Sequence, residues 1–215
     1  VFNGVSDKYH EHDVHSESGL YGVSKSLGEP PNACVIRTSI IGNDIESKAL
    51  LGWVRRMSQD RVSCIDGYVN QIWNGVTCLQ LSKIIATLIQ TKRYWTGVRH
   101  IFSPTCVSKY ELIQQIISIY QFPIEVRPVN VDPIDRTLSS CYDDNMQFSI
   151  PSLSIQLHDM KAFDERSSIP IGKFKYRSKC RFCDHDLQTV LHLGARFALA
   201  GGFLRDLDNE KNMNV

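Results

Sequence analysis

Tyr21 and Lys25 are the residues whose types and spacing are best suited to chemistry. They lie within residues 20–29, which are predicted to form a short helix that stops at Glu29 because two prolines follow. Residues four apart on a helix share one face, so the phenol and the ammonium are expected to lie side by side. A phenol holds its proton too tightly for catalysis at neutral pH, but a neighbouring cation favours the phenolate. The pair is therefore predicted to move a proton to or from a substrate oxygen. A chance contact on a helix surface is the other interpretation.

The segments that must position this pair follow an alternating pattern. Residues 33–41 are a β-branched apolar run closed by Gly42, which is typical of a strand buried on both faces of a parallel sheet. Apolar residues at helical spacing predict further helices over residues 45–61, 77–92, 107–120 and 151–163. Short strands are predicted over residues 98–102 and 124–129, the second broken by Pro128. Strands that alternate with helices indicate an α/β protein.

The first nineteen residues are predicted to lie mostly outside regular structure. Residues 1–4 look like the end of a buried strand that runs into a glycine turn. Residues 5–19, rich in Ser, Asp, Glu and His, suit a surface loop. His10, His12 and His15 lie together in this loop, where a solvated polar stretch is favoured over a metal site.

The composition restricts the class of partner. The 215 residues carry 24 Lys and Arg against 23 Asp and Glu, a formal charge of +1, so no broad positive field attracts nucleic acid or anionic lipid. The longest apolar stretches, such as residues 84–89, are far shorter than the roughly 20 residues that cross a bilayer. Seven cysteines, an odd number without compact spacing, are expected to be mostly reduced thiols. We expect a cytoplasmic protein without nucleic-acid or membrane partners.

Several ordered motifs carry a resemblance to a known family. They are, in chain order, Val1-Phe2-Asn3-Gly4, Tyr9-x-Glu11-x-Asp13, Tyr21-Gly22-x-Ser24-Lys25-x-x-Gly28-Glu29 and Val35-Ile36-Arg37-Thr38-Ser39. Together they resemble the extended short-chain dehydrogenase/reductase family, and most closely its dTDP-4-dehydrorhamnose reductase-like branch, which modifies nucleotide-activated sugars. The resemblance continues through Gly67-Tyr68-Val69-Asn70 and Trp73-Asn74-Gly75-Val76-Thr77, and more loosely to about Phe163. It implies the C-terminal part of a Rossmann-like, doubly wound parallel sheet with helices.

The resemblance implies roles for particular residues. Tyr21 would donate a proton to a sugar carbonyl as hydride arrives from a nicotinamide. Lys25 would adjust the acidity of Tyr21 and form a hydrogen bond with the nicotinamide ribose. Thr38 and Ser39 follow a strand, where such folds line the ligand crevice, so they are candidate cofactor contacts. Simple strand-end hydroxyls are the alternative. Arg136 lies in a region that helps to form the sugar-nucleotide pocket in similar proteins, where a guanidinium could hold the diphosphate. A solvent-exposed arginine is the alternative there.

Two parts of the family pattern do not occur in the sequence. No Gly-x-Gly-x-x-Gly or Gly-x-x-Gly-x-x-Gly motif is present to hold a cofactor pyrophosphate, and the family's catalytic Ser or Thr would precede Val1. The implied missing half has on the order of 100 residues, and without it central strands become edges with apolar faces open to water. NADP or NAD is therefore expected in a complete protein, for instance with a separately encoded N-terminal half. This chain alone is expected to be inactive. A non-catalytic, reductase-like binding or regulatory subunit is the alternative.

The C-terminal part differs in composition and pattern from residues 1–165, the predicted reductase-like domain. Residues 166–179 are charged and contain Ser, Pro and Gly, which predicts a linker. Residues 180–215 resemble the start of the zinc-binding domain that precedes some sugar C-methyltransferases, which implies a methyltransferase partner. Cys180 and Cys183 have the Cys-x-x-Cys spacing that presents two thiolates to one Zn²⁺, half of a tetrahedral site. The chain is expected to end in a truncated, zinc-ribbon-like tail, with two loose thiols as the alternative.

Overall fold

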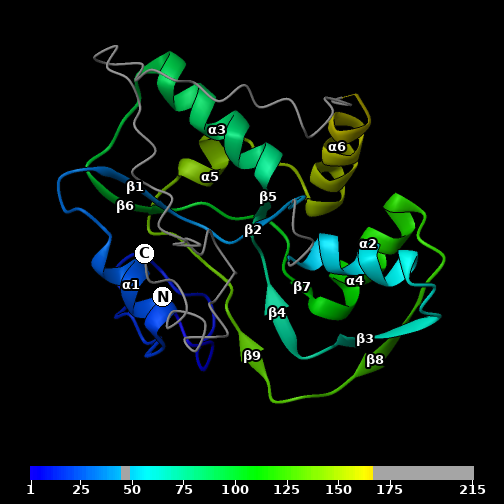
Figure 1. Cartoon of the computed structure of the whole chain (residues 1–215). Coiled ribbons are helices and arrows are strands. Elements are labelled where there is room, and N and C mark those ends of the chain that lie inside the picture. Colours follow the sequence, from blue (N-terminus) through cyan, green and yellow to red (C-terminus); the bar gives the residue numbers. More distant parts are fainter. Residues whose placement is uncertain (45–48, 167–215) are drawn as a thin grey trace, which may run out of the picture. The chain divides into compact units, whose positions relative to one another are not determined.

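Short strands alternate with helices along the chain, which gives the α/β arrangement of Figure 1. The computed structural model describes residues 1–44 and 49–166. In chain order the elements are α1 (Leu20–Leu27), β1 (Cys34–Arg37), β2 (Ile40–Ile41), α2 (Leu50–Gln59), β3 (Cys64–Tyr68), β4 (Gln71–Trp73), β5 (Val76–Thr77), α3 (Cys78–Thr91), β6 (Gly97–His100), β7 (Val107–Ser108), α4 (Lys109–Tyr120), β8 (Glu125–Val129), β9 (Ile134–Asp135), α5 (Asp144–Gln147) and α6 (Leu153–Arg166). The predicted helices and the α/β class are confirmed in this part of the chain.

The strands pair mostly in parallel, as the alternation of strands and helices predicts. Among the described residues β1 pairs with β6, β2 with β5 and β3 with β8, all parallel, and β4 lies between parallel β9 and antiparallel β7. The register of β1 on β6 sets Cys34 opposite Gly97 and Arg37 opposite His100. In this part of the chain, four small sheets, three of two strands and one of three, therefore take the place of one continuous sheet.

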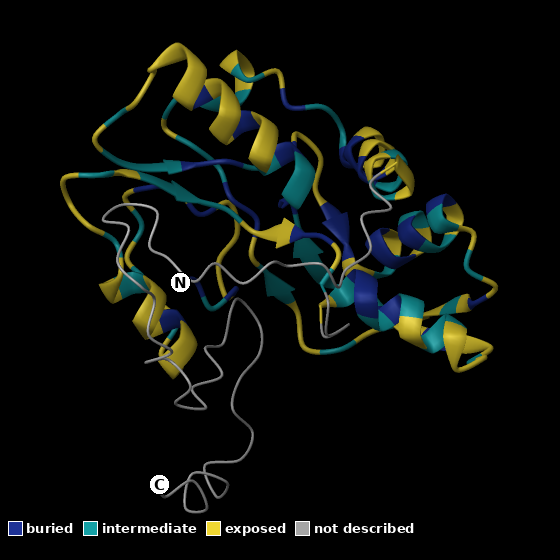
Figure 2. Cartoon of the chain, turned by 45° about the horizontal axis from the view of Figure 1, so that its top comes forward, coloured by how far each residue is buried: buried dark blue, intermediate teal, exposed yellow. Residues whose placement is uncertain are grey.

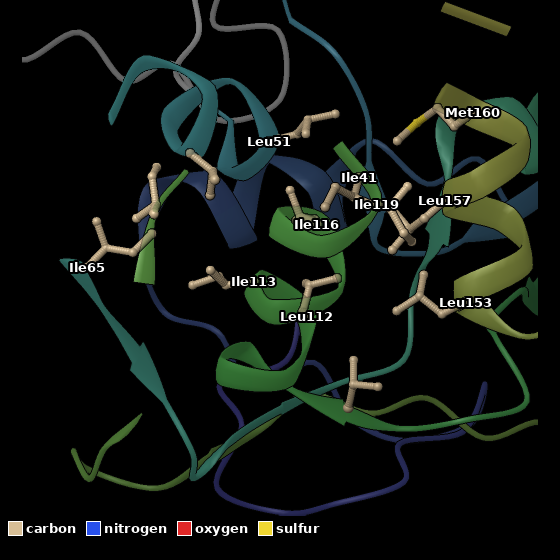
Figure 3. Close-up of a cluster of buried hydrophobic side chains, with 13 residues drawn as sticks. Ile41, Leu51, Ile65, Leu112, Ile113, Ile116, Ile119, Leu153, Leu157 and Met160 are labelled. Atoms are coloured by element: carbon tan, nitrogen blue, oxygen red, sulfur yellow. The ribbon is translucent and has the colours of Figure 1, made fainter. Parts of the chain in front are cut away.

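The largest apolar cluster surrounds α4. Its buried side chains Leu112, Ile113 and Ile116 face those of α2, β3 and α6, as Figure 3 shows. Ile116 is fully buried, with an exposed fraction of 0%. A second cluster lies between α3 and the β5–β6 region, and a third joins Phe2 and Tyr9 to Leu138. The α4 cluster is the largest of the three, and burial of apolar area is the main favourable contribution to folding.

The helices begin in different ways. The hydroxyl of Ser108 accepts a hydrogen bond from the Glu111 backbone N–H at 3.1 Å, and the Glu111 carboxylate accepts one from the Ser108 N–H at 2.7 Å. This capping box fixes the start of α4. Thr77 caps α3 by accepting from the Gln80 N–H. Helix α1 begins after Gly19, which has no side chain to cap it.

The run over residues 33–41 is not one strand buried on both faces. It divides into β1 and β2, and Cys34 and Ile40 are exposed while the rest of β1 is half-buried. The run divides because β1 pairs with β6 whereas β2 pairs with β5, and Thr38 and Ser39 between them have no strand assignment.

The interruption predicted at Pro128 is also wrong. Pro128 lies within β8 and pairs with Gly67 of β3. Proline lacks an N–H, which would be needed only for a partner on that side of the strand, and β8 pairs with β3 alone among the described residues. An edge strand can therefore include it.

The segment 5–19 is only partly a surface loop. It has no helix, and a single bridge joins Tyr9 to Leu138. Tyr9 and Glu11 are buried, however, because the Tyr9 ring stacks on Phe2 and the Glu11 carboxylate collects hydrogen bonds. The predicted strand end over residues 1–4 has no strand assignment; Gly4 has a φ of +86° there.

Within the described residues, no helix is both long and apolar enough to cross a membrane. The predicted linker and the predicted zinc-binding tail, with Cys180 and Cys183, lie outside the described residues apart from Arg166, the last residue of α6.

Candidate active site

The phenol and the ammonium predicted from the sequence do lie side by side. The Lys25 Nζ is 5.4 Å from the centroid of the Tyr21 ring, and both residues are on the exposed side of α1. Tyr21 has an exposed fraction of 36%. Both residues are therefore exposed to solvent.

A glycine lets α1 approach the chain segment that precedes it. Gly22 is the one buried residue of α1, and a Cβ there would lie 2.1 Å from the Cγ of Glu17. The Glu17 carboxylate in turn accepts a hydrogen bond from the Gly19 N–H at 3.1 Å. The Glu17 side chain thus occupies the space next to Gly22 of α1.

Arg136 lies next to the same glutamate. Its Nη2 is 3.5 Å from the Glu17 Oε2 and 3.5 Å from the Asn3 backbone oxygen, to which it donates. The side chain packs over Gly4, where a Cβ would lie 3.1 Å from the Arg136 Cγ and 2.4 Å from the Ile134 Cγ2. Half of the side chain, 51%, remains exposed. The structure therefore brings Arg136 close to α1 through Glu17 and leaves its guanidinium accessible.

Ser39 contacts β4 and β5, and Thr38 contacts Ser39. The Trp73 Nε1 donates to the Ser39 Oγ at 2.6 Å, and the Ser39 backbone oxygen accepts from the Val76 N–H at 2.9 Å. The Thr38 hydroxyl donates to the Ser39 carbonyl at 3.3 Å. These contacts fix the end of β1 against neighbouring strands, and a cofactor role for either hydroxyl stays a prediction.

A pocket that the sequence did not reveal lies between α2, β3 and α4. It has a volume of about 320 Å³ and is lined by Leu50, Trp53, Asp66, Tyr68, Lys109 and Ile113. The Lys109 Nζ lies 5.7 Å from the centroid of the Tyr68 ring. Partial burial of this ammonium lowers the pKa of Lys109, and the positive charge of Arg136 lowers it further. The pocket thus combines aromatic rings with the Lys109 ammonium, whose pKa is lowered in part by the charge of Arg136.

Sequence reasoning missed Lys109 and Trp53 because nothing in their local pattern marks them. Tyr68 lies in one of the segments that carry the family resemblance, which is the only signal that pointed to this region. The residues converge through the fold, since Lys109 follows β7 and Arg136 follows β9, the two strands that flank β4.

No group of three or more His, Cys, Asp or Glu side chains in the described residues is arranged to hold a metal ion. The predicted zinc ligands Cys180 and Cys183 lie outside those residues, so zinc binding stays a prediction. His15, expected to be solvated, instead contacts Ser26 and is half-buried.

The α/β fold is Rossmann-like, and it is similar to that of several solved structures. A dTDP-4-dehydrorhamnose reductase from Clostridium acetobutylicum superposes with a TM-score of 0.61 at 16% identity, covering 77% of this chain and 63% of that one. The enzyme of the same name from Bacillus anthracis, solved in complex with NADP, gives 0.61 at 22% identity over 76% and 62%. That from Yersinia enterocolitica gives 0.59 at 21% identity over 75% and 62%. The chain thus spans 62–63% of the length of these structures.

Comparisons by sequence give no further relative. No family model matches the chain, and no curated protein matches it.

Proposed function

We propose that this chain belongs to a nicotinamide-dependent reductase or epimerase that acts on a nucleotide-activated sugar, with Tyr21 as the proton donor. The observation that carries the proposal is the exposed Tyr21–Lys25 pair on α1, 5.4 Å from ammonium to ring centroid. The pair occurs on a fold that resembles solved dTDP-4-dehydrorhamnose reductases, one of which was crystallised with NADP.

The proposed chemistry reduces a carbonyl of the sugar. The hydride for the carbonyl carbon would come from a reduced nicotinamide when that cofactor is bound. The Tyr21 hydroxyl gives its proton to the carbonyl oxygen as negative charge develops there, so the product is an alcohol. The Lys25 ammonium stabilises the phenolate that remains on Tyr21. Both groups are exposed on one side of α1, which suits a residue pair that must reach cofactor and substrate together.

Arg136 and Lys109 are proposed to hold the diphosphate of the substrate. Burial lowers the pKa of Lys109 and the positive charge of Arg136 lowers it further, so an anion placed between the two side chains would favour the charged form of Lys109. The guanidinium of Arg136 can bind a phosphate through two nitrogens, while Lys109 acts as a point charge.

The pocket beyond Lys109 is proposed to hold the nucleoside part. Its volume of about 320 Å³ lies at the lower end of the range for small-molecule sites, and Trp53 and Tyr68 offer aromatic rings to a base. The sugar would then extend from Arg136 toward Glu17 and Tyr21, because Arg136 and α1 share Glu17 as a neighbour.

The test is a reductase assay on the chain joined by a nucleotide-binding half. We expect Tyr21→Phe to reduce turnover of a nucleotide-activated keto sugar by at least about 100-fold, because general acid catalysis contributes roughly 10²–10⁴. Cofactor affinity should stay nearly unchanged. Tyr94→Phe, which alters a tyrosine exposed after α3, is the matched control. Equal rates for Tyr21→Phe and the unmodified chain would contradict the role.

A second candidate function is a non-catalytic, reductase-like binding subunit. It is favoured by large apolar residues at the surface of α1 and α3, where Leu20 is 87% and Leu27 83% exposed and Ile89 is also exposed. The ribbons of both helices are coloured largely as exposed in Figure 2. Such apolar surface commonly marks a protein interface. On this alternative, Tyr21→Phe leaves function intact while Leu20→Ser with Leu27→Ser weakens partner binding.

A further inference from the structure

Helix α1 carries the proposed catalytic pair but has few apolar contacts that hold it. It buries Gly22 alone, and Leu20 and Leu27 point into solvent. An isolated helix of eight residues is unstable in water. Contacts on its inner side must therefore determine where Tyr21 and Lys25 lie.

The strongest of these contacts is an ion pair just after the helix. The Arg37 Nε donates to the Glu29 Oε1 and the Arg37 Nη2 to the Glu29 Oε2, each at 2.7 Å. The two side chains are 11% and 17% exposed. Burial alone would raise the pKa of Glu29, but the Arg37 hydrogen bonds and charge lower it. This two-pronged arrangement joins the end of the α1 segment to the last residue of β1, with little screening by solvent.

A histidine connects the helix itself to this ion pair. The His15 Nδ1 is hydrogen-bonded to the Ser26 Oγ of α1, and the His15 Nε2 is 3.7 Å from the Glu29 Oε2. Burial lowers the pKa of His15, and the charge of Arg37 lowers it further. Neutral His15 thus links α1 to the segment 5–19 on one side and to Glu29 on the other.

The Arg37 guanidinium makes further contacts through its Nη1. Its Nη1 donates to the Glu11 backbone oxygen at 3.3 Å and lies 3.5 Å from the Nε2 of His100, its register partner on β6. His100 is fully buried, and its Nδ1 lies 3.1 Å from the Tyr9 carbonyl and 2.9 Å from that of Ser139. Since two carbonyls can only accept, the Nδ1 carries the proton and the Nε2 presents its lone pair to Arg37.

The segment that supplies these carbonyls is fixed by Glu11. Its carboxylate accepts from the His100 N–H at 2.9 Å, the Ser140 hydroxyl at 2.5 Å and the Cys141 N–H at 2.9 Å. Burial alone would raise the pKa of Glu11, but these hydrogen bonds lower it. Arg37 is therefore attached to a rigid part of the fold.

We propose that His15, Glu29 and Arg37 are positioning residues that fix α1 and thereby aim Tyr21 and Lys25 at the substrate. Together with Ser26 they form what we call the α1 clasp. The inference rests on the proposed catalytic role of the Tyr21–Lys25 pair. The clasp holds one helix against one strand end, while the main core surrounds α4, so its loss releases α1 without unfolding the domain.

Amide hydrogen exchange on the full chain, without substrate, tests the clasp. In Glu29→Gln the charge of Arg37 loses its partner, so exchange of the α1 amides should accelerate roughly tenfold or more, while α4 amides keep their rates. The matched control is Asp159→Asn, which breaks the exposed Lys83–Asp159 ion pair of 2.7 Å and should change neither helix. Unchanged α1 exchange in Glu29→Gln, or equal acceleration in α1 and α4, would overturn the proposal.

His15→Gln is a gentler variant in case Glu29→Gln does not fold. The groups that face His15 are Ser26, Glu29, Arg37, the Phe2 ring and the amino group of Val1. Because the clasp uses neutral His15, α1 exchange in the unmodified chain, corrected for intrinsic rates, should rise severalfold as pH falls below about 6.5. In His15→Gln this pH dependence should weaken, and the part that remains is expected from His100, whose pKa is also lowered by burial and which contacts Arg37. An unchanged pH dependence would exclude His15 from the clasp.

Turnover then separates this inference from the proposed function. In the reductase assay, Glu29→Gln should lower kcat about tenfold or more with an unchanged KM for the sugar nucleotide, because the substrate contacts are elsewhere. If exchange responds and no reductase activity exists in any variant, the clasp stands and the proposed function fails. If activity exists and Glu29→Gln keeps the full kcat, the clasp does not position the pair.

Discussion

Helices α1 and α4 show two ways of holding a helix in one small domain. Helix α4 starts with the Ser108 capping box and buries four residues, among them fully buried Ile116, in the largest apolar cluster. Helix α1 starts after an uncapped glycine, buries Gly22 alone and is held by hydrogen bonds and an ion pair. The helix with the proposed chemistry is thus the less firmly packed of the two.

This difference has a physical consequence for function. Apolar packing is non-directional and stabilises the fold as a whole, whereas charge-assisted hydrogen bonds specify an orientation. A helix held by polar contacts can be aimed accurately and can also open locally, as regions with few buried apolar contacts do. Function is therefore expected to be lost by changes at α1 that leave stability nearly intact.

The largest expected effect is a difference in the free energy of unfolding between a variant in α4 and a variant in α1. Ile116→Ala removes a fully buried side chain of α4 and should lower the free energy of unfolding by about 2–5 kcal/mol. Leu27→Ala, at an 83% exposed position of α1, should change it by no more than about 0.5 kcal/mol. Urea unfolding followed by circular dichroism measures both. Similar losses for the two variants would remove the distinction.

A smaller effect is expected at the start of α4. Ser108→Ala removes the hydroxyl that accepts from the Glu111 N–H, at a cost of about 1 kcal/mol. Amide exchange should accelerate in the first turn of α4 and stay constant in α1, which has no such cap. Faster exchange of the α1 amides in this variant would mean that the stabilities of the two helices are coupled.

The smallest expected change in stability near neutral pH comes from the titratable groups Glu11, Glu29 and His100. The pKa of Glu11 and that of Glu29 are lower in the fold than the ordinary 4.5, because hydrogen bonds outweigh burial. Stability from these carboxylates is present above about pH 4.5 and is lost as pH falls through their lowered values. Burial lowers the pKa of His100 too, so stability already begins to decline below about pH 6.5. Urea midpoints measured from pH 7 to pH 3 check this sign; a midpoint that rises toward acid would contradict it.

Local patterns predicted the parts of this domain that depend on neighbours in sequence. The contact of Tyr21 with Lys25 follows from helical spacing, and the helices follow from apolar periodicity. The division of residues 33–41 into two strands and the continuity of β8 through Pro128 depend on which strand edges are paired, which local pattern does not reveal.

The remaining parts of the site depend on long-range register. Arg37 meets His100 only because β1 pairs with β6, 63 positions apart at this pair. Lys109 and Arg136 converge because β7 and β9 flank the same strand. Motif spacing singled out Glu11, Glu29 and Arg37 as bearers of a family resemblance but assigned them no contacts, so the α1 clasp could be recognised only in three dimensions.

The central claim is that α1, which carries the proposed chemistry, is held independently of the apolar core around α4. Amide hydrogen exchange of the unmodified full chain at pH 7 tests this claim most directly. Peptides that cover α1 and α4 can be followed in one experiment. We predict that α1 amides exchange through local opening at least about 100-fold faster than the slowest amides of α4, which exchange near the rate set by global unfolding. Equal protection of the two helices would contradict the account.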